Sequence, residues 1–355
     1  MYFPPYNPPL FVQNGVAMTV YASLWGSINW EKSTKFPEPP YKEQIFTGGQ
    51  GVPIFGWVAI PKNAHSTIIG TYGITGDLEN QWFLRLLGRK AYAQGYAVVL
   101  FDWRAHGKTA KLSPTLTSDG LYEGEDFVRI AATAAKMGCP SKFWFTGYSL
   151  GGQLALWGVK AAMELTHSNQ ILDITVSDIG GAAVICPNLD SRRSLTYLVS
   201  YPAGKYFEAR IAQSLKNLAW QLHQVHPGSF DPEAIEKANS IWGFDRELVI
   251  GRLGFSSPEA YYDASSALPL LKSLSKPTLI IYAQDDPFFA PAIIPDLQAI
   301  CAKNPAIDLL LTHRGGHVGY ISSKQCQRQA QDLDVWWAWN RILQWLEQQP
   351  KQIST

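Results

Sequence analysis

The chain is poor in cysteine and has almost no net charge. Its 355 residues include four cysteines, and no two of them form a CxxC pair or another spacing typical of a metal site. So few, scattered cysteines in a long chain favour a reducing compartment, and we expect a cytoplasmic protein with buried thiols. Lys and Arg number 30 against 29 for Asp and Glu. A formal charge of +1 provides no basic field for nucleic acid, so small or uncharged partners are favoured.

Long apolar runs are also absent. No stretch reaches the roughly 18 uncharged apolar residues that a membrane-spanning helix requires. The opening segment, MYFPPYNPPLFVQNG, has no basic region and is interrupted by prolines, so we do not interpret it as a signal peptide. No charged side chain precedes Glu31. We interpret residues 1–30 as an arm packed on the body of the protein, with a weak peripheral membrane contact as the alternative.

Short β-rich runs come first and are followed by alternating strands and helices. The Val, Ile, Tyr and Trp content of the early runs, with Gly and Pro between them, predicts strands at 18–25, 43–47, 52–60 and 66–73. From about residue 80 the pattern predicts a helix around 81–95, a strand at 96–103, a helix at 125–138, a strand at 142–147, a helix at 150–165 and a strand at 182–186. Such alternation predicts a mostly parallel twisted sheet with helices on both faces.

The alternation stops after Pro187. Residues 189–262 are helical in pattern and rich in aromatic side chains, and strand–helix alternation resumes at residue 276. We therefore predict an α/β core formed by 1–188 and 263–355, with 189–262 inserted as a helical cap.

One serine lies between glycines at a predicted strand-to-helix junction. In GYSLGG, Ser149 is flanked by Gly147 and Gly151, small residues that allow a strand and a helix to approach closely around a sharp turn. The free N–H groups at a helix N-terminus can stabilise a developing oxyanion. The backbone N–H of Leu150 and that of Ile74, in the loop YGITG, are the candidate donors. A plain turn without chemistry is the alternative interpretation of the motif.

A serine nucleophile needs a base and an orienting acid, and in this fold the chain order is serine, acid, histidine. Asp286 follows a buried strand and is the favoured acid, with Asp285 as the alternative. His317 lies in the glycine-rich HRGGHVGY loop after the next strand and is favoured as base over His313, which directly follows that strand.

Several other polar residues are assigned structural roles. Asp102 and Arg104 are expected to brace loops through a charge-assisted pair, and His106 is interpreted as structural. His223 and His226 lack a third ligand, so no metal site and no cofactor are predicted.

Together these segments resemble the α/β-hydrolase superfamily and, within it, the YheT-like branch of ABHD-type esterases. The resemblance runs nearly end to end. It is carried by NPPLFVQNGVAMT, with its Asn-Gly-x-x-x-Thr element, by YGITG and GYSLGG, and by the closing segments FSSPEAYYDASSALP, AQDDPFF and HRGGHVGYI.

The resemblance implies a serine esterase of the α/β-hydrolase fold with Ser149 as nucleophile, Asp286 as acid and His317 as base. Two departures from the branch stand out. Tyr72 replaces its usual His in the oxyanion loop, and DWRAHG replaces its Arg-Gly-Cys turn.

We therefore expect hydrolysis of a small-molecule carboxylic ester through an acyl-enzyme. An acyltransferase using the same triad and a non-catalytic binding module are the alternatives. An apolar substrate pocket is expected, and the oligomeric state is left open. The residues assigned to that pocket are all aromatic: Tyr72, Tyr148, Tyr201, Trp220 and Trp242.

Overall fold

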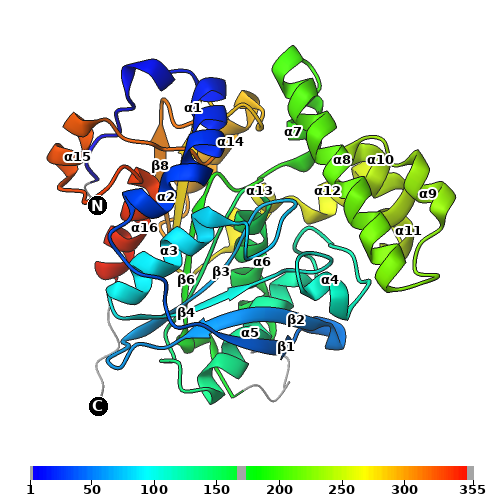
Figure 1. Cartoon of the computed structure of the whole chain (residues 1–355), viewed down its shortest axis with the longest axis horizontal. Helices are drawn as coiled ribbons and strands as arrows, with labels where there is room; N and C mark the ends of the chain where they lie inside the picture. The colour runs from blue at the N-terminus through cyan, green and yellow to red at the C-terminus, as the bar shows by residue number, and fades with distance from the viewer. Residues whose placement is uncertain (1–2, 166–172, 350–355) are drawn as a thin grey trace.

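An eight-stranded sheet forms the centre of the protein in a computed structural model that describes residues 3–165 and 173–349. The strand order is β1-β2-β4-β3-β5-β6-β7-β8 (Figure 1). β2 pairs antiparallel with both β1 and β4, and the remaining neighbours pair in parallel. The strands are β1 (Lys42–Thr47), β2 (Pro53–Ala59), β3 (Ser66–Thr71), β4 (Tyr96–Phe101), β5 (Phe143–Tyr148), β6 (Ile179–Ile185), β7 (Thr278–Ala283) and β8 (Ile307–Thr312).

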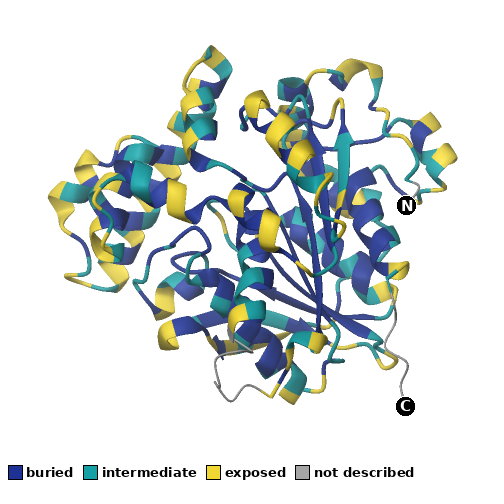
Figure 2. Ribbon diagram, turned by 180° about the vertical axis from the view of Figure 1, so that it is seen from behind, coloured by how far each residue is buried: buried dark blue, intermediate teal, exposed yellow. Residues whose placement is uncertain are grey.

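Helices cover both faces of the sheet, as predicted. Every residue of the central strands β3 to β7 is buried, which explains their nearly continuous apolar sequences (Figure 2). On one face, Phe83 of α3 stacks on Trp339 of α16; on the other, α5 packs against α6. The helices outside the cap and the arm are α3 (Trp82–Ala93), α4 (Thr109–Leu112), α5 (Glu123–Lys136), α6 (Leu150–Leu165), α13 (Ala267–Leu270), α14 (Ile294–Cys301), α15 (Lys324–Ala330) and α16 (Trp337–Glu347).

A helical segment joins β6 to β7, in the place predicted for the cap. It contains its own cluster of buried apolar residues, including Leu215, Leu222 and Phe244. A π-helical turn, η5 (Asp245–Val249), interrupts it. Its α-helices are α7 (Ser191–Leu198), α8 (Pro202–Val225), α9 (Pro232–Lys237), α10 (Ile241–Phe244), α11 (Ile250–Leu253) and α12 (Pro258–Ser265).

The arm is helical, and the predicted strand at 18–25 is wrong. α1 (Gly15–Tyr21) continues through a π-helical turn (Ala22–Gly26) into α2 (Ser27–Ser33). The Asn14 side chain caps α1 by accepting the N–H groups of Val16 and Ala17. Met18, Ala22 and Trp30 are buried at helical spacing against the core, and this packing overrides the local β-propensity.

The arm and the cap stand at the same end of the sheet, where β6 leads into α7 (Figures 1 and 2). Within the residues described, no helix has both the length and the apolar character needed to cross a bilayer.

Candidate active site

Ser149 occupies a sharp turn between β5 and α6. Its φ of +54° is a left-handed conformation, which non-glycine residues rarely adopt. A Cβ on Gly147 would lie 2.3 Å from the carbonyl oxygen of Gly151, and one on Gly151 would lie 2.3 Å from that of Tyr72. Only glycine fits at either position, so the sequence around Ser149 is dictated by this close packing.

Three loops bring the predicted triad residues together. The Oγ of Ser149 lies 2.9 Å from Nε2 of His317, and Nδ1 of the same ring lies 2.9 Å from Oδ2 of Asp286. The other oxygen of Asp286 accepts the N–H of Phe288 at 2.8 Å. Asp286 follows β7 and His317 follows β8, so parallel strands deliver all three groups to the carboxyl edge of the sheet.

The alternative acid and base point elsewhere. Asp285 accepts the N–H of Gly316 at 2.9 Å, and the His313 ring bonds to the Gln284 side chain at 2.7 Å. Neither contacts Ser149 in the structure. Burial raises the pKa of Asp285. Its contact with Gly316 instead ties the acid loop to the histidine loop.

The arm also holds the histidine loop. Thr19 Oγ1 accepts the N–H of His317 at 2.8 Å and donates to the carbonyl of Gly15 at 2.7 Å. A Cβ on Gly15 would lie 1.8 Å from the carbonyl oxygen of Asp285. The Asn-Gly-x-x-x-Thr element therefore packs directly against the acid and base loops, a role that the sequence analysis missed although it singled out the motif.

Two backbone N–H groups are available beside Ser149. Ile74 and Leu150 line the same cavity as Ser149, and neither donates its N–H to an acceptor in the part of the chain that the structure describes. A Cβ on Gly73 would lie 3.0 Å from that of Ser149, so this loop passes directly alongside the serine. These two N–H groups are the ones that were expected from the sequence to donate to an oxyanion, and that role remains a prediction.

The His106 side chain also holds this loop in place. Its Nε2 accepts the N–H of Thr75 at 3.2 Å, and Nδ1 bonds to the carbonyl of Arg104 at 2.9 Å. Since Nε2 accepts, the neutral ring carries its proton on Nδ1. Burial lowers the pKa of His106 to about 4. Thr75 has a left-handed φ of +61°, so this hydrogen bond supports a strained turn next to Ile74.

Comparison with known proteins agrees with the fold. The sequence profile of the alpha/beta hydrolase family matches residues 75–327. The chain belongs to this family. It is 54% identical over 351 residues to "Putative esterase slr0264" of Synechocystis sp., covering 98% of this chain and 95% of that protein.

More distant hydrolase relatives show the same relationship. "Putative esterase YheT" of Escherichia coli is 30% identical over 203 residues, 56% of this chain and 53% of that one. "Phospholipase ABHD3" of Mus musculus is 24% identical over 331 residues, covering 88% and 76%. The solved Pyrococcus furiosus esterase Pf2001 is similar in fold, with a TM-score of 0.53 and 18% identity, and the match covers 88% of this chain and 93% of that one.

The hydrolase core differs from expectation at Asp102 and Arg104, which do not pair. Arg104 donates two hydrogen bonds to Asp126, at 2.8 and 2.9 Å, and both side chains are fully buried. Asp102 accepts the hydroxyl of Tyr72 at 2.6 Å and the N–H groups of Leu78 and Lys108. Residues two positions apart in a tight turn need not face each other. Here Arg104 pairs with an acid on α5, and Asp102 is bound by a tyrosine hydroxyl and two backbone N–H groups. Burial raises the pKa of Asp102 to about 6.

None of the five aromatic residues assigned to a substrate pocket lines the cavity at Ser149, so this assignment is wrong for the pocket that the structure contains. The Tyr72 hydroxyl donates to Asp102, the Tyr148 hydroxyl donates to Gln81, and the Tyr201 hydroxyl donates to the carbonyl of Pro287. Tyr148 precedes Ser149 on β5 and points to the opposite face of the sheet, toward Phe83 and Trp339. In the cap, the rings of Trp220 and Trp242 pack on those of His223 and Tyr262.

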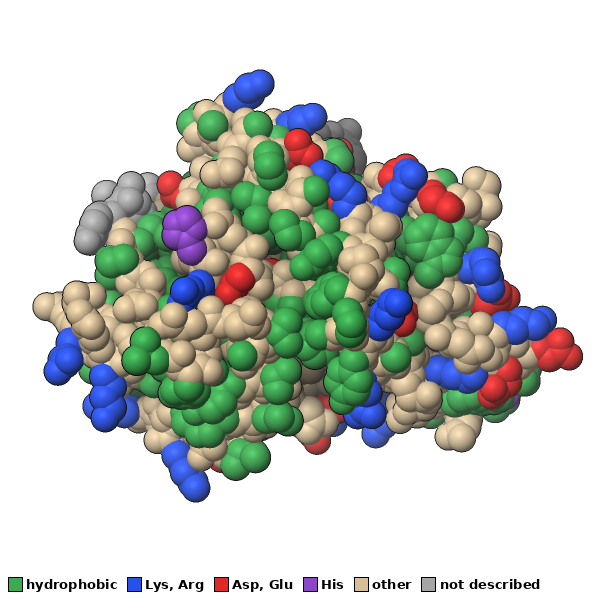
Figure 3. Space-filling model, turned by 90° about the horizontal axis from the view of Figure 1, so that it is seen from above, with side chains coloured by type: hydrophobic (Ala, Val, Ile, Leu, Met, Phe, Trp, Pro, Cys, Tyr) green, Lys and Arg blue, Asp and Glu red, His purple; other side chains and the backbone are tan. Residues whose placement is uncertain are grey.

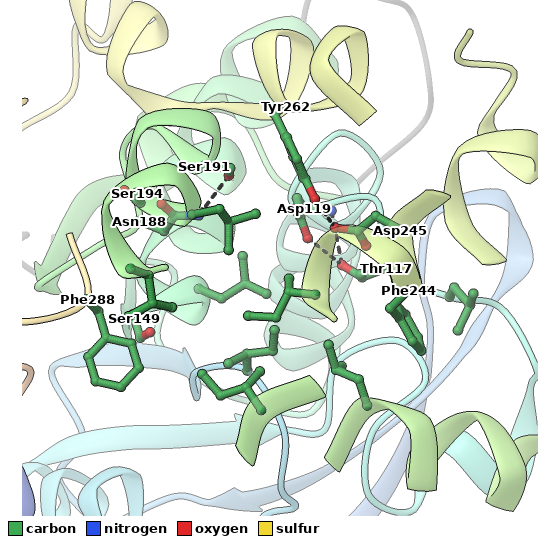
Figure 4. Close-up of a pocket in the computed structure, with 18 of the residues that line it drawn as sticks. Thr117, Asp119, Ser149, Asn188, Ser191, Ser194, Phe244, Asp245, Tyr262 and Phe288 are labelled. Carbon is green, nitrogen blue, oxygen red and sulfur yellow. Dashed lines mark hydrogen bonds between the residues drawn. The ribbon is translucent and has the colours of Figure 1, made fainter. Parts of the chain in front are cut away.

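The cavity instead runs from Ser149 between the hydrolase core and the cap (Figure 4). Aliphatic side chains, three phenylalanines and Trp103 form much of its wall. At the end away from Ser149 lie the polar side chains of Thr117, Asp119, Asp245 and Tyr262. None of these was expected from the sequence to line a pocket, because they come from separate segments with no spacing that would link them. Wall residues from the two sides include Leu116, Leu198, Ile211, Leu215, Ile241 and Phe244.

No metal site appears among residues 3–165 and 173–349, where no three His, Cys, Asp or Glu side chains gather in a way that could hold an ion. His226 bonds through Nε2 to the carbonyl of Ala110 at 2.8 Å, while the His223 ring packs on Trp220.

Proposed function

We propose that the chain hydrolyses carboxylic esters with Ser149 as nucleophile. The observation that carries this proposal is the unbroken hydrogen-bonded series from Ser149 through His317 to Asp286, with 2.9 Å at each step. This is the donor–acceptor order that a serine, its base and an orienting acid require. The free N–H groups beside the serine supply the remaining part of the machinery.

In the first half of the proposed reaction, Ser149 Oγ attacks the ester carbonyl and His317 Nε2 takes the hydroxyl proton. The negative charge that develops on the carbonyl oxygen is bound by the N–H groups of Ile74 and Leu150. Asp286 holds the ring in the required tautomer and stabilises the imidazolium.

In the second half, His317 gives its proton to the leaving alcohol, and the acyl group stays on Ser149. A water molecule then loses a proton to the same nitrogen and attacks the acyl-enzyme. The carboxylic acid leaves, and Ser149 regains its proton. An added alcohol or thiol in place of water would make the enzyme an acyltransferase, so product analysis with and without such an acceptor separates the two reactions.

We assign substrate selection to the cap, residues 189–262. Its helices supply one wall of the cavity and the core supplies the other. The wall is largely apolar, which favours an apolar acyl or alcohol portion of the ester.

Turnover of p-nitrophenyl esters of increasing acyl length tests the function. Ser149→Ala should lower kcat by a factor on the order of 10⁴ to 10⁶ and abolish labelling by a fluorophosphonate. Asp286→Asn should lower kcat by about 10⁴, because the ring loses its correct tautomer. Asp285→Asn is the matched control and should lose about tenfold or less, since the amide oxygen of Asn can still accept the N–H of Gly316. Equal losses in the two aspartate variants, or full activity in Ser149→Ala, would refute the assignment.

We also propose that the arm contacts a lipid surface. Leu10, Phe11, Leu24 and Ile28 are exposed on a segment without charged side chains up to Glu31, and Leu10 is 88% accessible. Figure 3 views the molecule from this end, and hydrophobic side chains are exposed in several groups across this face. Exposed apolar groups of this kind mark interaction sites, and one relative is named a phospholipase.

Co-sedimentation with phosphatidylcholine vesicles tests the contact. Leu24→Asp with Ile28→Asp should reduce the bound fraction. Val225→Asp, at an exposed site on α8 of the cap, is the control and should not. Absence of binding by the wild type would exclude the contact.

A further inference from the structure

The cavity that begins at Ser149 ends at two carboxyl groups that reach it from opposite sides. Asp119 comes from the core, in the loop between α4 and α5, and Asp245 comes from the π-helical turn of the cap. Both line the cavity, and they are 9% and 7% exposed (Figure 4). The hydroxyl of Tyr262 donates to one oxygen of Asp245 at 2.6 Å. A passage with apolar walls therefore terminates in acidic groups that bulk water barely reaches.

The core loop fixes Asp119 in this position. The Glu123 carboxylate accepts the N–H groups of Ser118 and Gly120 at 2.9 and 3.0 Å. Gln153 donates to the carbonyl of Asp119 at 2.7 Å. Asp119 itself has a left-handed φ of +50°. The backbone at Asp119 is thus held in a defined place by hydrogen bonds within its loop and from Gln153.

The cavity also carries polar atoms without protein partners. In the described part of the chain, Tyr262 is the one residue whose side chain is shown to donate to Asp245, and that bond occupies one of the two carboxyl oxygens. Nearer Ser149, the buried hydroxyl of Ser194 lines the same cavity, and no described residue forms a hydrogen bond with it. A buried polar atom left unpaired costs about 1–3 kcal/mol. Such atoms along one passage indicate a ligand that supplies the missing hydrogen bonds.

The electrostatics restrict what that ligand is. Burial, together with the charge of Asp245, raises the pKa of Asp119 well above its usual value, and burial raises the pKa of Asp245 to about 7. An anionic end, such as a second carboxylate or a phosphate, would be repelled whenever either carboxyl group is ionised. A methyl end would offer the two carboxyl groups no further hydrogen bond. A hydroxyl or amine end would donate to them.

We propose that the far end of the cavity recognises a hydrogen-bond donor, a hydroxyl or an amine, carried at the end of the otherwise apolar portion of the ester. Asp119 and Asp245 accept from this donor, while the apolar wall binds the intervening chain. The proposal rests on the esterase function and specifies its substrate class.

Matched esters that differ only at the end of the acyl chain test the proposal. Methyl-, hydroxyl- and amino-ended p-nitrophenyl esters are compared at several chain lengths. In the wild type, kcat/KM for the best donor-ended ester should exceed that of its methyl-ended partner by about tenfold or more. Asp119→Asn and Asp245→Asn should each reduce this ratio. Asp263→Asn, an exposed aspartate on α12 outside the cavity, should leave the ratio unchanged.

Binding to Ser149→Ala separates this inference from the proposed chemistry. Dissociation constants of methyl-, hydroxyl- and amino-ended alcohols are measured by calorimetry. Selective binding of donor-ended alcohols without any wild-type turnover would refute the esterase and uphold the recognition site. Turnover together with equal or better use of the methyl-ended series, or a ratio that survives both cavity substitutions, would overturn the recognition site alone. Tighter binding of the amino-ended alcohols would indicate an ion pair with an ionised carboxylate. Tighter binding of the hydroxyl-ended alcohols would indicate a hydrogen bond to a neutral carboxyl group.

Discussion

His106 shows how one buried residue supports the loop that is proposed to stabilise the oxyanion. Its ring stacks on that of Trp103 and accepts the N–H of Thr75, so only the neutral form fits. A protonated ring has no lone pair for this hydrogen bond. The histidine therefore links the protonation state of the core to the geometry beside Ser149.

This residue gives a pH prediction with a definite sign. Its pKa is lowered from 6.5 to about 4 on folding, so the unfolded chain binds more protons between these values. Its contribution to the free energy of unfolding is complete above about pH 6.5 and is lost as the pH falls toward 4, by up to about 3 kcal/mol.

Urea unfolding of the wild type and His106→Gln between these pH values checks this. Asp102 and Asp245 have raised pKa values and act with the opposite sign, so the difference between the two proteins is the informative quantity. That difference should shrink as the pH falls. A constant difference would contradict the prediction.

At the scale of elements, the arm is part of the site. Thr19 is the only residue of α1 shown to donate or accept a hydrogen bond with the His317 backbone in the described chain, and its hydroxyl is held by Gly15. An arm that was expected only to pack on the body of the protein therefore contacts the loop of the proposed base.

Thr19→Val should lower kcat by about tenfold with little change in KM, because it removes one hydrogen bond that orients His317. Thr19→Ser keeps the hydroxyl and should retain most of the activity. Steady-state kinetics of both variants, with thermal unfolding alongside, distinguishes positioning from stability. A loss of melting temperature without a loss of kcat would show that Thr19 is only structural.

A second link between elements is the buried pair of Arg104 and Asp126. It joins the loop after β4 to α5, and Arg104 also donates to the carbonyl of Gly49 at 3.0 Å. Asp126→Ala should lower the free energy of unfolding by about 3–5 kcal/mol, because it leaves a buried guanidinium without its partner.

Denaturant unfolding measures this loss. Asp173→Ala removes the partner of Lys136 in a pair that is 66% and 58% exposed, and it should cost less than about 1 kcal/mol. Similar losses in the two variants would show that breaking the buried Arg104 pair destabilises the protein no more than breaking an exposed pair.

For the molecule as a whole, the features that depend on patterns along the chain could be predicted from the sequence. Apart from the proposed triad, side-chain contacts between distant segments could not. The parallel strands were predictable because burial on both faces requires continuous apolar runs, such as those of β4 and β7. Ser149, Asp286 and His317 could be named because chain order and flanking glycines mark their loops. Residues 18–25 were misassigned because tertiary burial of Met18 outweighs local propensity.

The residues that line the cavity could not be predicted from the sequence, for a related reason. Asp119 and Asp245 meet only after the cap has folded over the core, and no local pattern records that contact. Aromatic residues of the cap were assigned to the pocket because the cap is rich in them, whereas aliphatic side chains form the largest group in the wall. The same limit applies to Arg104, whose true partner lies on another element.

The bond between Thr19 and His317 joins residues 298 positions apart. During synthesis Thr19 leaves the ribosome before the loop that contains His317. Translation of the intervening residues takes on the order of half a minute. The proposed site can thus be completed only after His317 has been translated, and the growing chain would carry no fully assembled hydrolase before then.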